Sequence, residues 1–272
     1  MIIDLHCHTN MSDGALTPNQ LLDLASERGV DMLSITDHDT LDAYAHTSSV
    51  PPGMRLIPGI ELSSRWRKQG VHIVGLNIDL SNPVMASAVA EQSAIRLQRA
   101  QEISVRLERL GFDGCLEGAQ RFAHNQIGRP HFAQHLIAVG AVKNYNEAFK
   151  KYLGAGKAGD IKEHWPDIET VVQWIKQAGG IAVLAHPSKY KMTRTKLTEL
   201  IGDFKNAGGE AMEVVSGLQI PSLTRDLAKL CTQFGLLASC GSDFHSPDKK
   251  WAALGLISNL PETCKPIWDR WS

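Results

Sequence analysis

The chain has 272 residues and a formal net charge of -1 at pH 7. This length permits one domain, with or without an insert, but not three. Hydrophobic residues make up 43% of the chain and charged residues 21%, as in a soluble globular protein rather than a disordered or fibrous one. The near-neutral charge argues against a protein that coats long nucleic acid by charge alone.

The ends, apolar runs and cysteines of the sequence predict a cytoplasmic protein. No apolar run approaches the roughly 18 residues that a membrane-spanning helix requires. The start, MIIDLHCHT, lacks the basic segment and apolar stretch of a signal peptide. The cysteines are odd in number and never form a CxxC pair, so we expect reduced thiols at Cys7, Cys115, Cys231, Cys240 and Cys264.

Short apolar runs alternate with helical stretches in the first third of the chain. Ile2 to Leu5 predicts a strand, and Thr17-Pro18 predicts the N-cap and first turn of a helix that Gly29 ends. The segments MLSIT, RLIPGIEL and VHIVGLNI predict further strands, because each is short, apolar and bounded by turn residues.

Residues 83–159 have a different, helical pattern. The run VMASAVAEQSAIRLQRAQEISVRLERLG places apolar residues every three or four positions, which predicts one long amphipathic helix. LEGAQRFA, PHFAQHLIAVG and NEAFKKYLG predict shorter helices. We therefore expect residues 83–159 to be an inserted helical subdomain that caps the substrate, and residues 1–82 and 160–272 to form the catalytic domain.

The alternation of helices and strands returns after residue 160. IAVLAHP, AMEVVSG and LLASCGSDFH predict strands, each preceded by a helical segment. Strands that are continuous apolar runs between helices are typical of a parallel sheet buried on both faces. The fold class is therefore α/β, and a compact series of such units favours a barrel that is short or distorted.

Side chains that could bind metals gather at the ends of the predicted strands, and most follow a strand, whereas His72 begins one. Residues just past the carboxyl ends of strands face the active site in parallel α/β folds. A single His at such a position is more often packed or hydrogen-bonded than a ligand, but buried imidazoles and carboxylates from six segments need a cation between them. The set comprises His6, His8, Asp13, Asp37, His38, Asp39, Glu61, His72, His186, Asp243 and His245. This chemistry suits Mn, Zn or Fe, and the absence of a thiolate-rich set argues against a structural zinc site.

The motifs DLHCHTNMSDG, ITDHD, PGIE, HIVGL, AHP and GSDFH, in this order, resemble the polymerase and histidinol phosphatase (PHP) family of metal-dependent phosphoesterases. The resemblance implies a distorted (β/α)7 barrel that holds up to three divalent metals, with Mn favoured. It assigns the first metal to His6, His8, Glu61 and Asp243. It assigns the second, bridged by Glu61, to His72 and His186, and the third to Asp13, His38 and His245. Cys7 lies between two ligands, and strand alternation predicts that it faces the core.

The helical segment is similar to that of the subgroup containing ribonuclease AM and the 3′,5′-nucleoside bisphosphate phosphatases. This resemblance implies removal of the 3′-phosphate from adenosine 3′,5′-bisphosphate and trimming of short 5′-phosphorylated RNA in the 5′-to-3′ direction. The sequence departs from the subgroup at Asp160, where an aromatic residue is expected, and at Ser188-Lys189, where Gly-Arg is more usual. Both departures concern the substrate side of the site.

The expected mechanism is attack on phosphorus by a hydroxide that bridges two metals, while the third metal holds phosphate oxygens. The expected catalytic residues are His6, His8, Glu61, His131, Asp243 and His245. Asp37 and Asp39 flank His38 and could orient imidazoles. Capping of the next helix is an equally good interpretation of these two carboxylates.

Four residues are expected to bind substrate. Arg129 and His131 begin a predicted helix, where Arg129 could clamp the second phosphate and His131 could contact the scissile group. Alternatively, His131 is a half-buried polar residue of an amphipathic helix. Lys157 could reach a phosphate or be a solvated loop residue, and Tyr190 could border the nucleoside. His135, Trp165 and Trp174 are assigned no chemistry.

Two other functions compete with this interpretation. One is a phosphatase for histidinol phosphate or another small phosphate, although Arg129 would then have no second anion to bind. The other is a metal-holding domain that has lost catalysis and only binds a partner, against which the intact ligand set argues. We expect a small nucleotide or a short RNA end as partner, no long nucleic-acid track and no membrane. The sequence leaves open the native metal, the oligomeric state and the preference between nucleotide and RNA.

Overall fold

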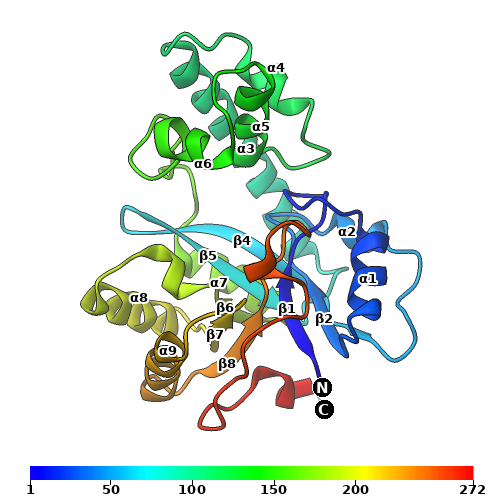
Figure 1. Ribbon diagram of the computed structural model, residues 1–272. Coiled ribbons are helices and arrows are strands. Elements are labelled where there is room, and N and C mark those ends of the chain that lie inside the picture. Colours follow the sequence, from blue (N-terminus) through cyan, green and yellow to red (C-terminus); the bar gives the residue numbers. More distant parts are fainter. Residues whose placement is uncertain (272) are drawn as a thin grey trace.

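The computed structural model describes residues 1–271, which form strands and helices in the order that Figure 1 labels. The strands are β1 (Ile3–Cys7), β2 (Met32–Ile35), β3 (Arg55–Leu56), β4 (Gly59–Trp66), β5 (Gln69–Leu76), β6 (Ile181–Leu184), β7 (Ala211–Ser216) and β8 (Leu237–Gly241). The α-helices are α1 (Pro18–Glu27), α2 (Asp42–Ala45), α3 (Pro83–Glu108), α4 (Cys115–Gln120), α5 (Arg129–Ala138), α6 (Tyr145–Ala148), α7 (Ile168–Gln177), α8 (Arg194–Asn206) and α9 (Pro221–Gln233). A π-helical turn, Phe149–Leu153, continues α6.

The strands form two sheets, in the orders β1-β2-β3 and β4-β5-β6-β7-β8. The first sheet is parallel, and so are the pairs β6-β7 and β7-β8, as the sequence predicts. The expectation of a parallel arrangement is wrong for β4-β5 and β5-β6, which are antiparallel. Strands β4 and β5 are joined by only two residues, Arg67 and Lys68, and so short a loop connects antiparallel neighbours.

Hydrogen bonds connect the two sheets at two places. Between β2 and β4, the Glu61 amide donates to the Asp37 carbonyl at 3.1 Å, and the Asp39 amide donates to the Glu61 carbonyl at 2.9 Å. Between β1 and the end of β8, the Asp243 amide donates to the His6 carbonyl at 2.8 Å. Both junctions lie where the predicted metal ligands leave their strands, so the backbone itself brings these ligands together.

Local sequence signals explain how the helices begin and pack. Thr17 caps α1, and its side chain and that of Gln20 satisfy each other's backbone amides in a capping box. Helix α7 buries Val171, Val172 and Ile175 against the larger sheet. A side chain at Gly75 would meet Ile175 at 3.0 Å, so this glycine lets helix and strand approach closely.

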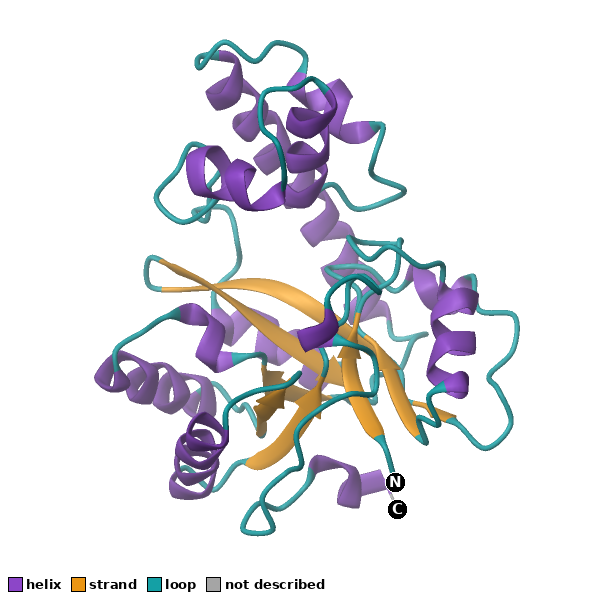
Figure 2. Cartoon of the chain, viewed as in Figure 1, coloured by secondary structure: helices purple, strands orange, loops and turns teal. Residues whose placement is uncertain are grey.

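Helices α3 to α6 lie above the sheets in Figure 1, and Figure 2 shows no strand among them. The prediction of a helical structure for residues 83–159 is thereby confirmed. These helices enclose a hydrophobic cluster of their own, which includes Ile103, Phe132 and Leu136. Helix α3 connects it to the main core, where Met85 is buried.

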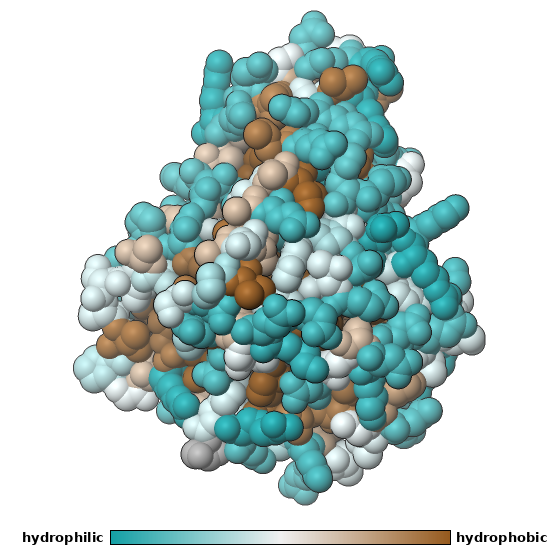
Figure 3. Space-filling view, turned by 180° about the vertical axis from the view of Figure 1, so that it is seen from behind, coloured by the Kyte–Doolittle hydropathy of each residue, from teal (hydrophilic) through white to brown (hydrophobic). Residues whose placement is uncertain are grey.

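Among the described residues, no helix is long and apolar enough to cross a membrane. Seen from behind in Figure 3, the surface is mostly hydrophilic or neutral, with hydrophobic residues in separate groups.

Candidate metal centre and substrate pocket

The side chains predicted to bind metals lie together at the junctions between the two sheets. Strand β1 supplies His6, and His8 follows it directly; the loop after it supplies Asp13. The other members are His38 after β2, Glu61 in β4, His72 in β5, His186 after β6, and Asp243 and His245 after β8. They form four overlapping groups in which the possible ligand atoms lie within 4.8 Å of one another.

Glu61 occupies the centre of this cluster and is fully buried. Its Oε1 lies 2.8 Å from His72 Nδ1 and 2.9 Å from His186 Nε2. Its Oε2 lies close to three more imidazole nitrogens: His6 Nε2 at 3.2 Å, His8 Nε2 at 3.3 Å and His38 Nδ1 at 3.1 Å. The two oxygens therefore face separate sets of ligands, an arrangement that permits one carboxylate to bridge two cations.

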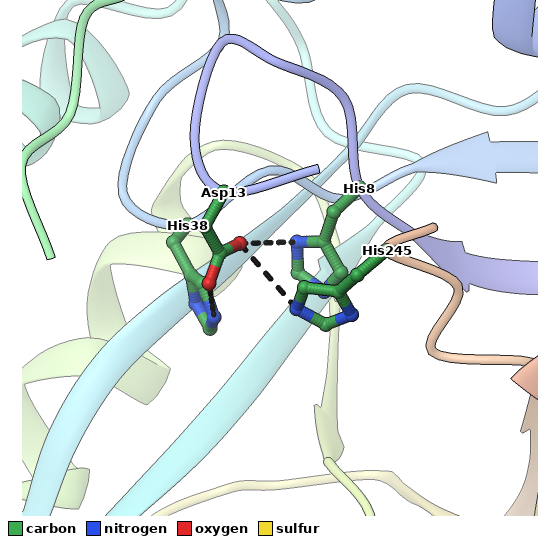
Figure 4. A group of neighbouring side chains, drawn as sticks. All are labelled: His8, Asp13, His38 and His245. Atoms are coloured by element: carbon green, nitrogen blue, oxygen red, sulfur yellow. Dashed lines mark ion pairs between the residues drawn. The ribbon is translucent and has the colours of Figure 1, made fainter. Parts of the chain in front are cut away.

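Asp13 is the centre of the remaining group, which Figure 4 shows with its ion pairs. Its carboxylate lies 3.4 Å from His245 Nε2 and 3.9 Å from both His8 Nδ1 and His38 Nε2. Three imidazoles from three different segments thus point at one carboxylate.

The backbone turns sharply at two members of this cluster, His186 and Asp243, and at Asp39 next to a third. Asp39, His186 and Asp243 adopt positive φ angles of 55°, 27° and 53°. Residues other than glycine rarely hold this conformation, and such strain gathers at functional sites. Strand alternation turns Cys7 away from the cluster, and its buried thiol donates to the Ser34 carbonyl at 3.2 Å. This agrees with the predicted core position of Cys7.

Several buried nitrogen and oxygen atoms of the cluster lack a hydrogen-bond partner, which is consistent with a site for cations. Glu61 Oε2, His8 Nδ1, His38 Nδ1 and His186 Nδ1 are buried and make no hydrogen bond within the described residues. Unpaired buried polar atoms are costly unless a charge of opposite sign lies between them. A donor set of imidazoles and carboxylates without thiolates suits Mn, Zn or Fe.

Charges within the cluster shift its protonation equilibria strongly. Burial opposes ionisation of Glu61, yet the surrounding imidazoles hold its pKa well below its usual value. Burial lowers the pKa of His8, but the carboxylates of Asp243 and Glu61 outweigh this effect and raise it to about 10. Without cations His8 therefore retains a proton, and metal binding at this imidazole has to displace it.

Sequence reasoning missed Glu213, which supports two of the ligands. Its Oε1 lies 2.5 Å from His6 Nδ1, and its Oε2 accepts a hydrogen bond from the His186 amide at 2.6 Å. Carboxylates behind ligating histidines fix the orientation of the ring. The only signal in the sequence is a single acid within the apolar strand AMEVVSG.

Both interpretations of Asp37 and Asp39 are wrong. Asp37 accepts hydrogen bonds from the amide and hydroxyl of Thr9 and from Ser12, and it thereby anchors the loop that carries Asp13. Asp39 accepts from Ser63 and Arg96. Neither carboxylate has a hydrogen bond to an imidazole within the described chain, and Leu41 occupies the N-cap of α2 without a side-chain bond.

A cavity of about 440 Å³ opens on the candidate metal cluster, and several basic side chains line it. Arg96 and Arg99 of α3 line it, and their guanidinium groups lie 5.4 and 5.3 Å from the ring centre of Trp165. Lys189 lines it as well and contacts the carboxylate of Asp243. Sequence reasoning assigned no role to these arginines or to Trp165, because charges on a long helix are usually solvated.

The four predicted substrate residues differ in their positions. Arg129 lines the cavity, donates to the Leu153 carbonyl at 3.1 Å and lies 3.7 Å from the carboxylate of Asp160. One departure from the subgroup pattern, Asp160, therefore contacts the predicted phosphate clamp, and the other, Lys189, contacts a predicted metal ligand.

The other three do not line this cavity. His131 is buried, and its Nδ1 accepts the Gly128 amide at 2.9 Å. Lys157 lies exposed in its loop. The Tyr190 hydroxyl accepts the His72 amide and donates to the Ala185 carbonyl, both at 2.9 Å, and its ring packs edge-on against His186.

Comparison with known proteins identifies the class to which this fold and site belong. The PHP domain model matches residues 4–181, and the chain therefore belongs to the PHP domain family. It is a phosphoric ester hydrolase of this family.

Two curated relatives and one solved structure resemble the chain over nearly its whole length. It is 42% identical to the 3′,5′-nucleoside bisphosphate phosphatase of Chromobacterium violaceum, covering 98% of this chain and 95% of the relative. It is 43% identical to the 5′-3′ exoribonuclease Rnm of Escherichia coli, covering 100% and 94%. The structure of an amidohydrolase from Chromobacterium violaceum with bound sulfate superposes with a TM-score of 0.92 at 41% identity, covering 99% and 95%.

Proposed function

We propose that this protein hydrolyses the 3′-phosphate ester of nucleoside 3′,5′-bisphosphates and removes nucleotides from the 5′ end of short 5′-phosphorylated RNA. The observation that carries the proposal is the cationic cavity that opens on the cluster around Glu61. A substrate with two phosphates can place one at the cluster and the other among the arginines. The names of the relatives support the same two substrate classes.

For the fold, we propose a distorted (β/α)7 barrel that carries residues 83–159 as a capping subdomain. The hydrogen bonds that join β2 to β4 and β1 to β8 support closure of the strands into a ring. The separate hydrophobic cluster of α3 to α6 supports an insert between 1–82 and 160–272.

For the metals, we propose up to three divalent ions, with Mn favoured over Zn and Fe. His6, His8, Glu61 and Asp243 would hold the first, Glu61, His72 and His186 the second, and Asp13, His38 and His245 the third. When bound, such ions neutralise phosphate oxygens and lower the pKa of water.

The chain's own residues bind and orient the substrate. Arg129, Arg96 and Arg99 hold the phosphate that does not react, since a guanidinium presents a planar fork that matches phosphate oxygens. His131 positions Arg129 indirectly. It accepts a hydrogen bond from the Gly128 amide, which fixes the start of α5, where Arg129 is the first residue. Tyr190 holds the strand of His72 against the loop of His186. Lys157 is exposed outside the cavity, where it can contact only larger substrates.

The experiment is to incubate the Mn-loaded protein with adenosine 3′,5′-bisphosphate and to identify the nucleotide that is released. The proposal predicts adenosine 5′-monophosphate and inorganic phosphate, and a loss of turnover on chelation. Glu61→Ala should abolish turnover and reduce the number of Mn ions bound, because Glu61 is assigned to two of the three sites. Glu91→Ala on the exposed side of α3 should change neither. Release of adenosine 3′-monophosphate, or turnover by Glu61→Ala at the original rate, contradicts the proposal.

A further inference from the structure

A second cavity of about 590 Å³ adjoins the metal cluster, and the proposed function leaves it unassigned. Asp13, Pro130, Phe149 and His245 line both this cavity and the cationic one. Two of these four residues, Asp13 and His245, are predicted metal ligands. A substrate that extends on both sides of its scissile phosphate can therefore place that phosphate at the cluster and one end in each cavity.

The two cavities differ in chemical character. The first is lined by Arg96, Arg99, Arg129 and Lys189. The second is lined by the rings of Tyr145 and Phe149, and away from the shared cluster residues its charges are one Lys249 and one Asp248, which offset each other. Such a surface does not concentrate phosphate, but aromatic rings stack on nucleobases of any sequence.

Polar groups suited to a nucleotide lie beside these rings. Gln134 lines the second cavity, and its side-chain carbonyl oxygen is buried and accepts no hydrogen bond within the described residues. Asn146, which is exposed, adds an amide at the same wall. Tyr145 is 42% exposed, so its ring is accessible to a ligand. An unpaired acceptor can receive a ribose hydroxyl or a base amino group.

We propose that the second cavity binds the second nucleotide of a 5′-phosphorylated RNA, with its base stacked on Tyr145. This inference rests on the proposed function. The 5′-terminal nucleotide occupies the cationic cavity; water adds to the phosphorus at the cluster, the bond from phosphorus to the 3′-oxygen breaks, and that oxygen takes a proton. The scissile phosphorus then remains on the second nucleotide as its new 5′-phosphate. A nucleoside bisphosphate ends at the cluster and never reaches Tyr145.

The test compares adenosine 3′,5′-bisphosphate with the 5′-phosphorylated dinucleotide pApA as substrates of Tyr145→Ala. One stacked base is worth about 1–3 kcal/mol, so kcat/KM on pApA should fall roughly five- to a hundredfold. The value on the bisphosphate should stay within about twofold. Tyr145→Phe keeps the ring and should retain the rate on pApA. Phe122→Ala removes a similarly exposed aromatic ring outside both cavities and should alter neither substrate.

Each other outcome overturns the inference in a recognisable way. Equal losses on both substrates would place Tyr145 beside the terminal nucleoside or in folding. Unchanged rates on both would mean that RNA does not use the second cavity. Turnover of the bisphosphate but not of pApA by the wild-type protein would refute the second cavity and the RNA half of the proposed function, but not the bisphosphate half. Turnover of neither would refute the proposed function itself.

Discussion

At the scale of single residues, the side chains that the sequence proposes as metal ligands, with Glu61 at their centre, lie together in the structure. Most of the proposed ligands follow a strand end beside a distinctive neighbour, as in AHP and SDFH, whereas Glu61 and His72 lie within β4 and β5. The supporting residues have no such pattern. Glu213 lies 207 positions from His6, and only the fold brings the two together. The sequence therefore yields the proposed ligands but not the groups that orient them.

Glu213 provides the first prediction at this scale. Glu213→Gln keeps the size of the side chain but weakens its interaction with the His6 ring. Loss of an orienting carboxylate typically costs ten- to a hundredfold in metal affinity or activity, and we expect roughly that loss in Mn affinity. Calorimetric titration of the metal-free protein with Mn measures it. An unchanged affinity would show that Glu213 only stabilises the fold.

Arg129 provides the second. If it clamps the phosphate that does not react, Arg129→Ala should lower kcat/KM on adenosine 3′,5′-bisphosphate roughly ten- to a hundredfold, the equivalent of about 1.5–3 kcal/mol. An aryl monophosphate should be affected little, and Arg129→Lys should recover only part, because lysine lacks the two-point fork. Equal losses on both substrates would instead assign Arg129 to the reacting phosphate or to folding.

At the scale of elements, the sequence patterns do not predict that β5 runs antiparallel to both of its neighbours, β4 and β6. Short apolar runs predict strands β4 and β5 but not their pairing, which depends on the two-residue loop at Arg67 and Lys68. The same holds for α3. Its apolar spacing predicts a long helix correctly. The helix spans two hydrophobic clusters rather than lying on one, and Arg96 and Arg99 are buried along the wall of the cavity instead of facing solvent.

Helix α3 is held to the smaller sheet by a buried ion pair between Arg96 and Asp39, with Nε and Oδ2 2.6 Å apart. Arg96→Met would leave the buried carboxylate without its partner, which typically costs about 3–5 kcal/mol in the free energy of unfolding. The matched control is Arg106→Met on the same helix, whose pair with Glu102 is largely solvated and worth below about 1 kcal/mol. Urea unfolding of both variants measures the difference, and equal effects would contradict the role of this pair.

At the scale of the whole molecule, a net charge of -1 conceals a strong separation of charge. Carboxylates gather with imidazoles in the proposed metal cluster, and guanidinium groups gather in the adjoining cavity. A long basic track would favour long nucleic acid, whereas a confined group of cations favours substrates with two phosphates close together. The near-neutral net charge predicts that a long basic track is absent, but only the fold reveals the confined group of basic side chains.

In the proposed function, the cationic cavity selects a second phosphate while the cluster hydrolyses the first. The most direct test is a comparison of kcat/KM, with the Mn-loaded protein, on adenosine 3′,5′-bisphosphate, on adenosine 3′-monophosphate and on histidinol phosphate. The two adenosine compounds share the scissile ester and differ only in the 5′-phosphate. We predict that the bisphosphate exceeds both other substrates at least tenfold and that chelation abolishes the difference. Equal rates on the two adenosine compounds, or a preference for histidinol phosphate, would contradict the proposed selection of a second phosphate.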